Sequence, residues 1–259
     1  MASNDVEGRP LWLHRECAKL ITKGNLLTLT VPPKCVDKGE WVAHQVVEQY
    51  RLLSAFVRVV SELDSDSTSI CNAERCPTMS AGEHCYTWID EDEQPVRLLA
   101  HQYITVIRDW ISRKLDDELL FPTDPLGATA NLYPHHACQT DLSGNSDENW
   151  LGCRSGFPQN FAAACRLICR QMFRIYAHLY WNHFEDFYHL SLEKSLNSCF
   201  GSFLMVTVTH DMLQSGDVQP MRDLISLWAA NGTFPADSKL GGLADLDRGK
   251  YFSGEATPC

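Results

Sequence analysis

The sequence of 259 residues has no run of 18 apolar residues, so it contains no candidate for a membrane-spanning helix. Its first ten residues, MASNDVEGRP, lack the basic stretch followed by an apolar one that marks a secretory signal. We therefore expect the protein to stay in the cytoplasm. The nucleus and the cell cortex or division site are further expected locations.

Basic residues are also scarce. The chain has 22 Lys and Arg against 33 Asp and Glu, which gives a formal net charge of −11. Nucleic acids and anionic membranes call for basic surfaces, so this balance argues against both as partners. It favours a basic partner, although charge can also serve solubility alone.

Cysteine is abundant, with 11 residues, but a reducing compartment disfavours disulfides. Most of these residues, such as Cys165, Cys169 and Cys199, lie in apolar helical runs. We interpret them as small buried hydrophobes. The sequence has no internal repeat.

The hydrophobic pattern is almost wholly helical and predicts one domain over residues 10–230, between flexible ends at 1–9 and 231–259. Its longest helix candidate, residues 158–194, is expected to be two helices with a bend. Asp37 and Glu40 form a capping-box pattern at the start of another. The remaining helices are predicted over residues 12–21, 40–63, 102–120, 196–213 and 220–230. Residues 122–157 carry prolines and glycines without a period, which predicts a disordered insertion loop.

Two pairs of potential metal ligands stand about a hundred residues apart. Cys71 and Cys76 lie in ICNAERCPTMSAG, and His178 and His183 lie in FRIYAHLYWNHF. Two thiolates and two imidazoles make a full tetrahedral set for structural zinc. A metal held by them would clamp a segment before one helix to the interior of another.

Spacing alone leaves this site open. Residues five apart on a straight helix point about 140° apart, so the helix would have to bend or end near one histidine. His84, Cys85 and His189 are competing ligands. A catalytic zinc needs an open position and a nearby base, and the pattern HExxH is missing, which disfavours a metal-dependent hydrolase.

A second candidate surface is basic. Arg166, Arg170 and Arg174 follow one another at intervals of four, which places three guanidiniums along one helix face. Guanidinium forks suit phosphate oxygens. An ordinary solvated face is the alternative interpretation.

Several blocks in order resemble the Mob/phocein family of kinase activators, over roughly residues 10–230 apart from the insertion. Residues 10–37 resemble fungal members that pair with NDR-type kinases. The blocks are VDKGEWVA (36–43), CPTMSAG (76–82), YTW (86–88), KLDDELLFP (114–122), FPQNF (157–161) and FRIYAHLYWNHF (173–184).

The resemblance implies an all-α fold, a globular domain around an antiparallel four-helix bundle. It also implies a structural zinc held by two cysteines and two histidines. Those ligands fall on Cys71, Cys76, His178 and His183.

The resemblance further implies a non-catalytic coactivator that binds the basic N-terminal regulatory region of an NDR/LATS-type Ser/Thr kinase. Its role would lie in cell polarity, morphogenesis or mitotic exit. The matching kinase-binding positions are Glu40 and Glu48, while a third, acidic in the family, is Val36 here.

Family members also bind phosphorylated peptides of upstream kinases or scaffolds through a basic cluster. Arg170 and Arg174 match two of its positions, Arg166 lies one turn before them, and the third position is Gln171. A phosphopeptide-reading scaffold without kinase activation, as in phocein-type members, is therefore the alternative function.

Overall fold

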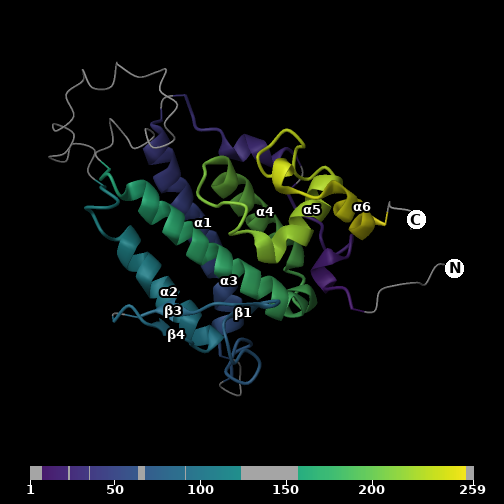
Figure 1. The fold of residues 1–259 in the computed structure, drawn as a ribbon, viewed down its shortest axis with the longest axis horizontal. Helices are drawn as coiled ribbons and strands as arrows, with labels where there is room; N and C mark the ends of the chain where they lie inside the picture. The colour runs from purple at the N-terminus through teal and green to yellow at the C-terminus, as the bar shows by residue number, and fades with distance from the viewer. Residues whose placement is uncertain are drawn as a thin grey trace.

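The computed structural model describes residues 8–22, 24–34, 36–63, 68–90, 92–123 and 157–254. This part of the chain is mostly helical, as predicted (Figure 1). The α-helices are α1 (Lys38–Ser61), α2 (Ala100–Leu115), α3 (Phe161–His189), α4 (Glu193–Thr209), α5 (Arg222–Ala230) and α6 (Leu246–Ser253). The 3₁₀ helices are η1 (Leu11–Leu13), η2 (Leu26–Thr30), η3 (Gln219–Met221) and η4 (Gly241–Leu243). No helix in the described ranges is long and apolar enough to span a bilayer.

Helix α3 is the centre of the fold. It contacts α1, α2 and α4, and α1 also contacts α4 (Figure 1). More than half of its 29 residues are buried, so it is apolar around most of its circumference, as expected of a helix enclosed by others. Residues 158–194 were predicted to form two helices with a bend between them. Instead, α3 runs without interruption to His189, and the chain turns only after it, at Ser191, whose φ is 56°.

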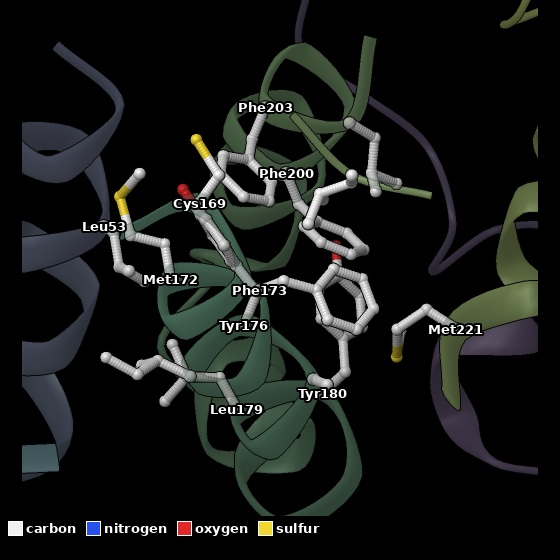
Figure 2. Packing of buried hydrophobic residues seen from close by; sticks show 14 of the residues in the cluster. Leu53, Cys169, Met172, Phe173, Tyr176, Leu179, Tyr180, Phe200, Phe203 and Met221 are labelled. Carbon is white, nitrogen blue, oxygen red and sulfur yellow. The ribbon is translucent and has the colours of Figure 1, made fainter. Parts of the chain in front are cut away.

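Aromatic side chains from α3 and α4 fill the core (Figure 2). Tyr176 and Tyr180 of α3 lie against Phe200 of α4, with ring centroids 5.0 Å apart in both pairs. Tyr176 also lies 5.1 Å from Phe203. Offset and tilted aromatic pairs of this kind add to the free energy gained by burial alone.

The start of α1 is as predicted. Asp37 is the N-cap, and its Oδ1 accepts a hydrogen bond of 2.8 Å from the Gly39 amide. Six of the seven apolar residues spaced at helical intervals along α1 are buried, namely Val42, Val46, Leu53, Phe56, Val57 and Val60, while the seventh, Trp41, is half-buried. The helix predicted over residues 12–21 is wrong, because these residues form only η1 and turns. Residues 26–30 form η2.

Two short antiparallel hairpins connect α1 to α2. Strand β1 (Ser80–Ala81) pairs with β2 (His84–Cys85), and β3 (Trp88–Ile89) pairs with β4 (Pro95–Val96). Gly82 turns the first hairpin with φ at 58°, and a Cβ there would lie 3.0 Å from the ring of Trp181 in α3. Glycine is therefore required for both the turn and the close contact with α3.

The C-terminal region corrects the prediction of a flexible tail over residues 231–259. Residues 232–254 fold back on α5, burying Phe234, Leu240 and Phe252. Helix α6 packs on α5 at Gly249, where an added Cβ would lie 2.1 Å from the Ser226 carbonyl oxygen. The glycines that made this segment look mobile include the one that lets the two helices meet. Residues 255–259 lie outside the described residues.

The N-terminal prediction also changes at Arg9, which had been placed in the flexible segment 1–9. Its guanidinium donates a 3.3 Å hydrogen bond to the Phe252 carbonyl and lies over the Phe252 ring at 5.2 Å. Residues 1–7 lie outside the described residues.

Most of the predicted insertion loop, residues 124–156 of 122–157, lies outside the described residues. Its two ends are described and lie close together. Phe121 and Phe157 both contact the ring of Phe161, with centroids 5.2 and 4.0 Å away. The chain therefore leaves and re-enters the domain at one aromatic cluster, so a long insertion between these residues need not disturb the helices.

Candidate metal centre and binding surfaces

Helix α3 and the segment after α1 bring together the four predicted ligands. Sγ of Cys71 lies 3.8 Å from Nε2 of His178, and Sγ of Cys76 lies 3.4 Å from Nε2 of His183. All four ligand atoms lie within 4.8 Å of one another. A tetrahedral zinc with ordinary bond lengths would hold sulfur and nitrogen about 3.6 Å apart, so the donor set and its spacing fit zinc.

All four side chains are buried, with at most 3% of any of them exposed. The two imidazoles meet within an uninterrupted α3, with ring centroids 5.2 Å apart, so neither a break nor a helix end is needed. The competing ligands His84, Cys85 and His189 are exposed and lie outside the group.

The backbone of the first hairpin orients His178. Its Nδ1 lies 2.8 Å from the carbonyl oxygen of Ser80, and the side-chain amide of Asn182 donates to the same oxygen at 3.0 Å. A proton on Nδ1 leaves the Nε2 lone pair facing the sulfurs, which is the tautomer that a metal requires.

A carboxylate orients His183. Oδ2 of Asp186 lies 3.3 Å from Nδ1 of His183, and both Asp186 oxygens accept hydrogen bonds from the Arg75 guanidinium, at 3.1 and 3.0 Å. Arg75 adjoins Cys76 in the sequence. This ion pair therefore ties the cysteine segment to α3 a second time, outside the ligand atoms.

The two cysteines differ in electrostatic surroundings. The hydrogen bond with Cys71, supported by the imidazoles of His178 and His183, lowers the pKa of Cys76. The same hydrogen bond, together with burial, raises the pKa of Cys71. The metal-free pair would thus share one proton, and because thiolates are the metal-binding form, binding would release it. In contrast, burial alone raises the pKa of Cys169 to about 12, as expected of an inert core thiol.

We expect Asp186→Asn to lower zinc affinity about 10- to 100-fold, because the imidazole of His183 loses its carboxylate partner. Competition with a chromogenic chelator measures this. The matched control is Asp211→Asn, which breaks the surface ion pair with Lys239 and should leave affinity unchanged, since asparagine tolerates the positive φ of this position. Equal zinc affinity in Asp186→Asn and the unmutated protein would exclude a role for this carboxylate.

The supporting residues Arg75, Ser80, Asn182 and Asp186 were not predicted. Part of the signal was present, because Asn182 follows His178 by four positions and Asp186 follows His183 by three. On a helix, these intervals place side chains on neighbouring positions.

A model of the Mob1/phocein family matches residues 18–221 of this chain, well over half of its length. The chain belongs to the Mob1/phocein family. The family match contains α1 to α4 and all four residues of the candidate metal centre. It ends before α5, so α5 and α6 lie beyond it.

Curated relatives of this Mob1/phocein chain include kinase activators by name. "Maintenance of ploidy protein mob2" of Schizosaccharomyces pombe is 34% identical over 86% of this chain and 78% of its own length. "CBK1 kinase activator protein MOB2" of Candida albicans is 33% identical over 89% of this chain and 63% of its own length. "MOB kinase activator-like 1A" of Arabidopsis thaliana is 30% identical over 82% and 84%. The chain thus spans less than two thirds of the Candida relative.

The predicted acidic positions of this Mob1/phocein chain lie on α1. Glu40 is exposed in the first turn. Glu48 lies two turns further, has 39% of its side chain exposed and forms a 3.1 Å ion pair with the more exposed Arg51. An exposed ion pair of this kind contributes little to stability, so a partner could take the place of Arg51. The carboxylates of Glu40 and Glu48 are therefore both available to a partner.

The three predicted arginines on α3 are half-buried, and each already has a contact within the domain. Arg166 donates to the Asp211 carbonyl at 3.2 Å. Arg170 lies 2.9 Å from a carboxylate oxygen of Asp217, a close ion pair rather than a well-aligned hydrogen bond. The alternative interpretation of these three arginines as an ordinary solvated face therefore does not fit the structure.

Arg174 faces a different neighbourhood. It donates to the Tyr103 hydroxyl at 2.9 Å and lies over the Tyr86 ring at 5.1 Å. Gln171, which stands at the third basic position, is 8% exposed, and its Oε1 accepts from Tyr103 and Arg174 at 3.4 Å. A buried amide here holds Arg174 against α2 and adds no positive charge.

Proposed function

We propose that this chain is a non-catalytic coactivator of an NDR/LATS-type Ser/Thr kinase. In this proposal it binds the basic N-terminal regulatory region of the kinase and promotes its activation in polarity, morphogenesis or mitotic-exit signalling. The observation that carries the proposal is membership of the Mob1/phocein family together with relatives whose names state kinase activation. The net charge of −11 supports a basic partner.

The binding surface in this proposal is the outer face of α1. Glu40 and Glu48 are eight residues apart, so they are separated by about 12 Å along the helix axis. Two carboxylates at this separation suit basic side chains about two turns apart on a helix, or about four residues apart in an extended segment. Electrostatic complementarity of this kind sets specificity and association rate more than it adds affinity.

The metal has a structural role in this proposal. Cys71, Cys76, His178 and His183 would hold one zinc and brace an antiparallel four-helix bundle. Four buried protein ligands complete a tetrahedral shell and leave no open position for a water or substrate. In this proposal the protein acts by binding partners at its surface and not by catalysis at the metal, so we propose that it is not an enzyme. We place it in the cytoplasm, with the nucleus and the cell cortex or division site as further locations.

Glu48→Lys is expected to weaken binding of the kinase segment about 10- to 100-fold, because it replaces attraction by like-charge repulsion. Stability should change by less than about 0.5 kcal/mol, since the ion pair with Arg51 is exposed. Calorimetric titration with a synthetic N-terminal segment of an NDR-type kinase, alongside a melting curve, measures both.

The matched control is Glu62→Lys at the far end of α1, where the glutamate side chain is 68% exposed and forms an ion pair with Arg58. It makes the same change in net charge about 21 Å from Glu48 along the axis. The control should bind the segment nearly as well as the unmutated chain. Equal loss in both variants would mean that net charge, and not the α1 surface, determines binding.

A second candidate function is a phosphopeptide-reading scaffold without direct kinase activation. The arginines of α3 favour it because guanidiniums suit phosphate oxygens. The ion pair between Arg170 and Asp217 opposes it, because a phosphate would have to displace the carboxylate of Asp217. Affinity purification from cells separates the two functions. Recovery of an NDR-type kinase supports the coactivator, whereas recovery of phosphoproteins that phosphatase treatment removes, without such a kinase, supports the scaffold.

A further inference from the structure

A surface groove of about 640 Å³ lies between the metal-bearing part of the molecule and the C-terminal helices. One wall comes from the first hairpin and α3, and the other comes from η3 and the N-terminal ends of α5 and α6. The residues that matter below are Gly82, Glu83, Trp181, Arg222, Asp245 and Arg248. We call this the C-terminal groove.

The part of the second wall that α5 and α6 form lies beyond residue 221, where the family match ends, and it is firmly fixed. Arg248 of α6 forms a two-point ion pair with Asp223 of α5. The Asp245 amide donates to the Ser226 hydroxyl at 3.0 Å, and Gly249 sits directly on α5. Figure 1 shows α5 and α6 side by side at the C-terminal end of the chain.

The apolar part of the groove is the indole of Trp181, which is held in place but 39% exposed. Its Nε1 donates to the Pro220 carbonyl at 3.0 Å, and its ring lies against Gly82. The Trp12 ring lies at 5.3 Å with an interplanar angle of 74°. A large side chain that is rigidly held and still exposed is typical of a contact point for a partner.

The charges around Trp181 favour a cationic occupant. The groove lining holds three carboxylates, of Glu83, Asp223 and Asp245, against two guanidiniums, of Arg222 and Arg248. Asp223 pairs with Arg248, Asp245 caps α6 by accepting from the Arg248 amide, and Glu83 and Asp245 are both exposed. Small-molecule pockets are mostly apolar and enclosed, whereas five of the eleven residues that line this groove are charged and most of the eleven are exposed. A protein segment therefore fits better than a small ligand.

We propose that the C-terminal groove binds a basic, extended segment of a partner protein. An apolar side chain of the segment lies against Trp181, and flanking Lys or Arg side chains face Glu83 and Asp245. This surface is separate from the acidic face of α1 and does not depend on kinase binding there.

The test uses the full chain labelled with ¹⁵N and a heptapeptide in which Lys and Arg flank a central leucine. We expect saturable shifts of the Trp181 indole N–H signal. The double variant Glu83→Gln with Asp245→Asn should bind the peptide about three- to tenfold more weakly at low salt, because two surface charge pairs are lost. Asparagine still caps α6, so the groove stays intact.

The matched control is the double variant Glu16→Gln with Glu62→Gln, which removes two exposed carboxylates elsewhere and should bind like the unmutated chain. Glu48→Lys should also bind the heptapeptide normally, which separates this proposal from the one for α1. The proposal is overturned if no shift occurs at Trp181, if an acidic heptapeptide binds equally well, or if the control loses as much affinity as the groove variant.

Discussion

Cys76→Ala is expected to release the zinc and to lower the free energy of unfolding by at least about 4 kcal/mol, a fall in Tm on the order of 10 °C. The reason is that metal binding to a site absent from the unfolded chain contributes directly to folding. The three remaining ligands would also be left buried without their fourth partner, with His183 only 3.4 Å from the vacated position. Zinc content by mass spectrometry and a thermal melt measure the two effects.

Cys85→Ala is the control for this change. Cys85 is exposed on β2 of the first hairpin and does not belong to the group of four candidate ligands. It should keep its zinc and its Tm. If Cys76→Ala also keeps both, the four side chains do not hold a structural metal.

Gly249→Ala is expected to undock α6 from α5 and to destabilise the protein by about 2–3 kcal/mol, the usual cost of forcing an atom into a packed contact. The added Cβ would lie 2.1 Å from the Ser226 carbonyl oxygen and 2.7 Å from Cβ of Ala230. Both are held by α5 and cannot give way cheaply. Denaturant unfolding measures the stability, and faster amide exchange across residues 246–253 reports the undocking.

Gly242→Ala is the control, because an added Cβ there meets nothing within 4 Å. It should change stability by less than about 0.5 kcal/mol. Gly249→Ala with unchanged amide exchange in α6 would mean that the two helices do not meet as closely as described.

The sequence predicts well what depends on neighbouring residues. The cap at Asp37 and the buried face of α1 follow from spacing alone, and both are present. The four candidate metal ligands are different, because the two pairs are about a hundred residues apart and only the family blocks joined them. The five-residue interval between His178 and His183 predicted a bend or a helix end near one of them. In the structure α3 is regular, and the two imidazole rings still meet, with centroids 5.2 Å apart.

The remaining features depend on contacts that the sequence does not encode locally. The composition of residues 231–254 suggested mobility, because its few apolar residues are dispersed among Gly, Asp and Ser. They are buried only because α5 provides a surface for them. The spacing likewise predicted Arg174 only as one member of a basic row, and its contacts with Tyr86 and Tyr103 could not be foreseen without the position of α2.

Coactivation of an NDR-type kinase can be measured directly. An NDR-type kinase containing its basic N-terminal region is assayed for peptide phosphorylation, alone and with an equimolar amount of this chain. We expect the phosphorylation rate to rise with the unmutated chain, to rise much less with Glu48→Lys, and to be zero with the chain alone. A rate that does not change although the two proteins bind would contradict coactivation and favour the scaffold.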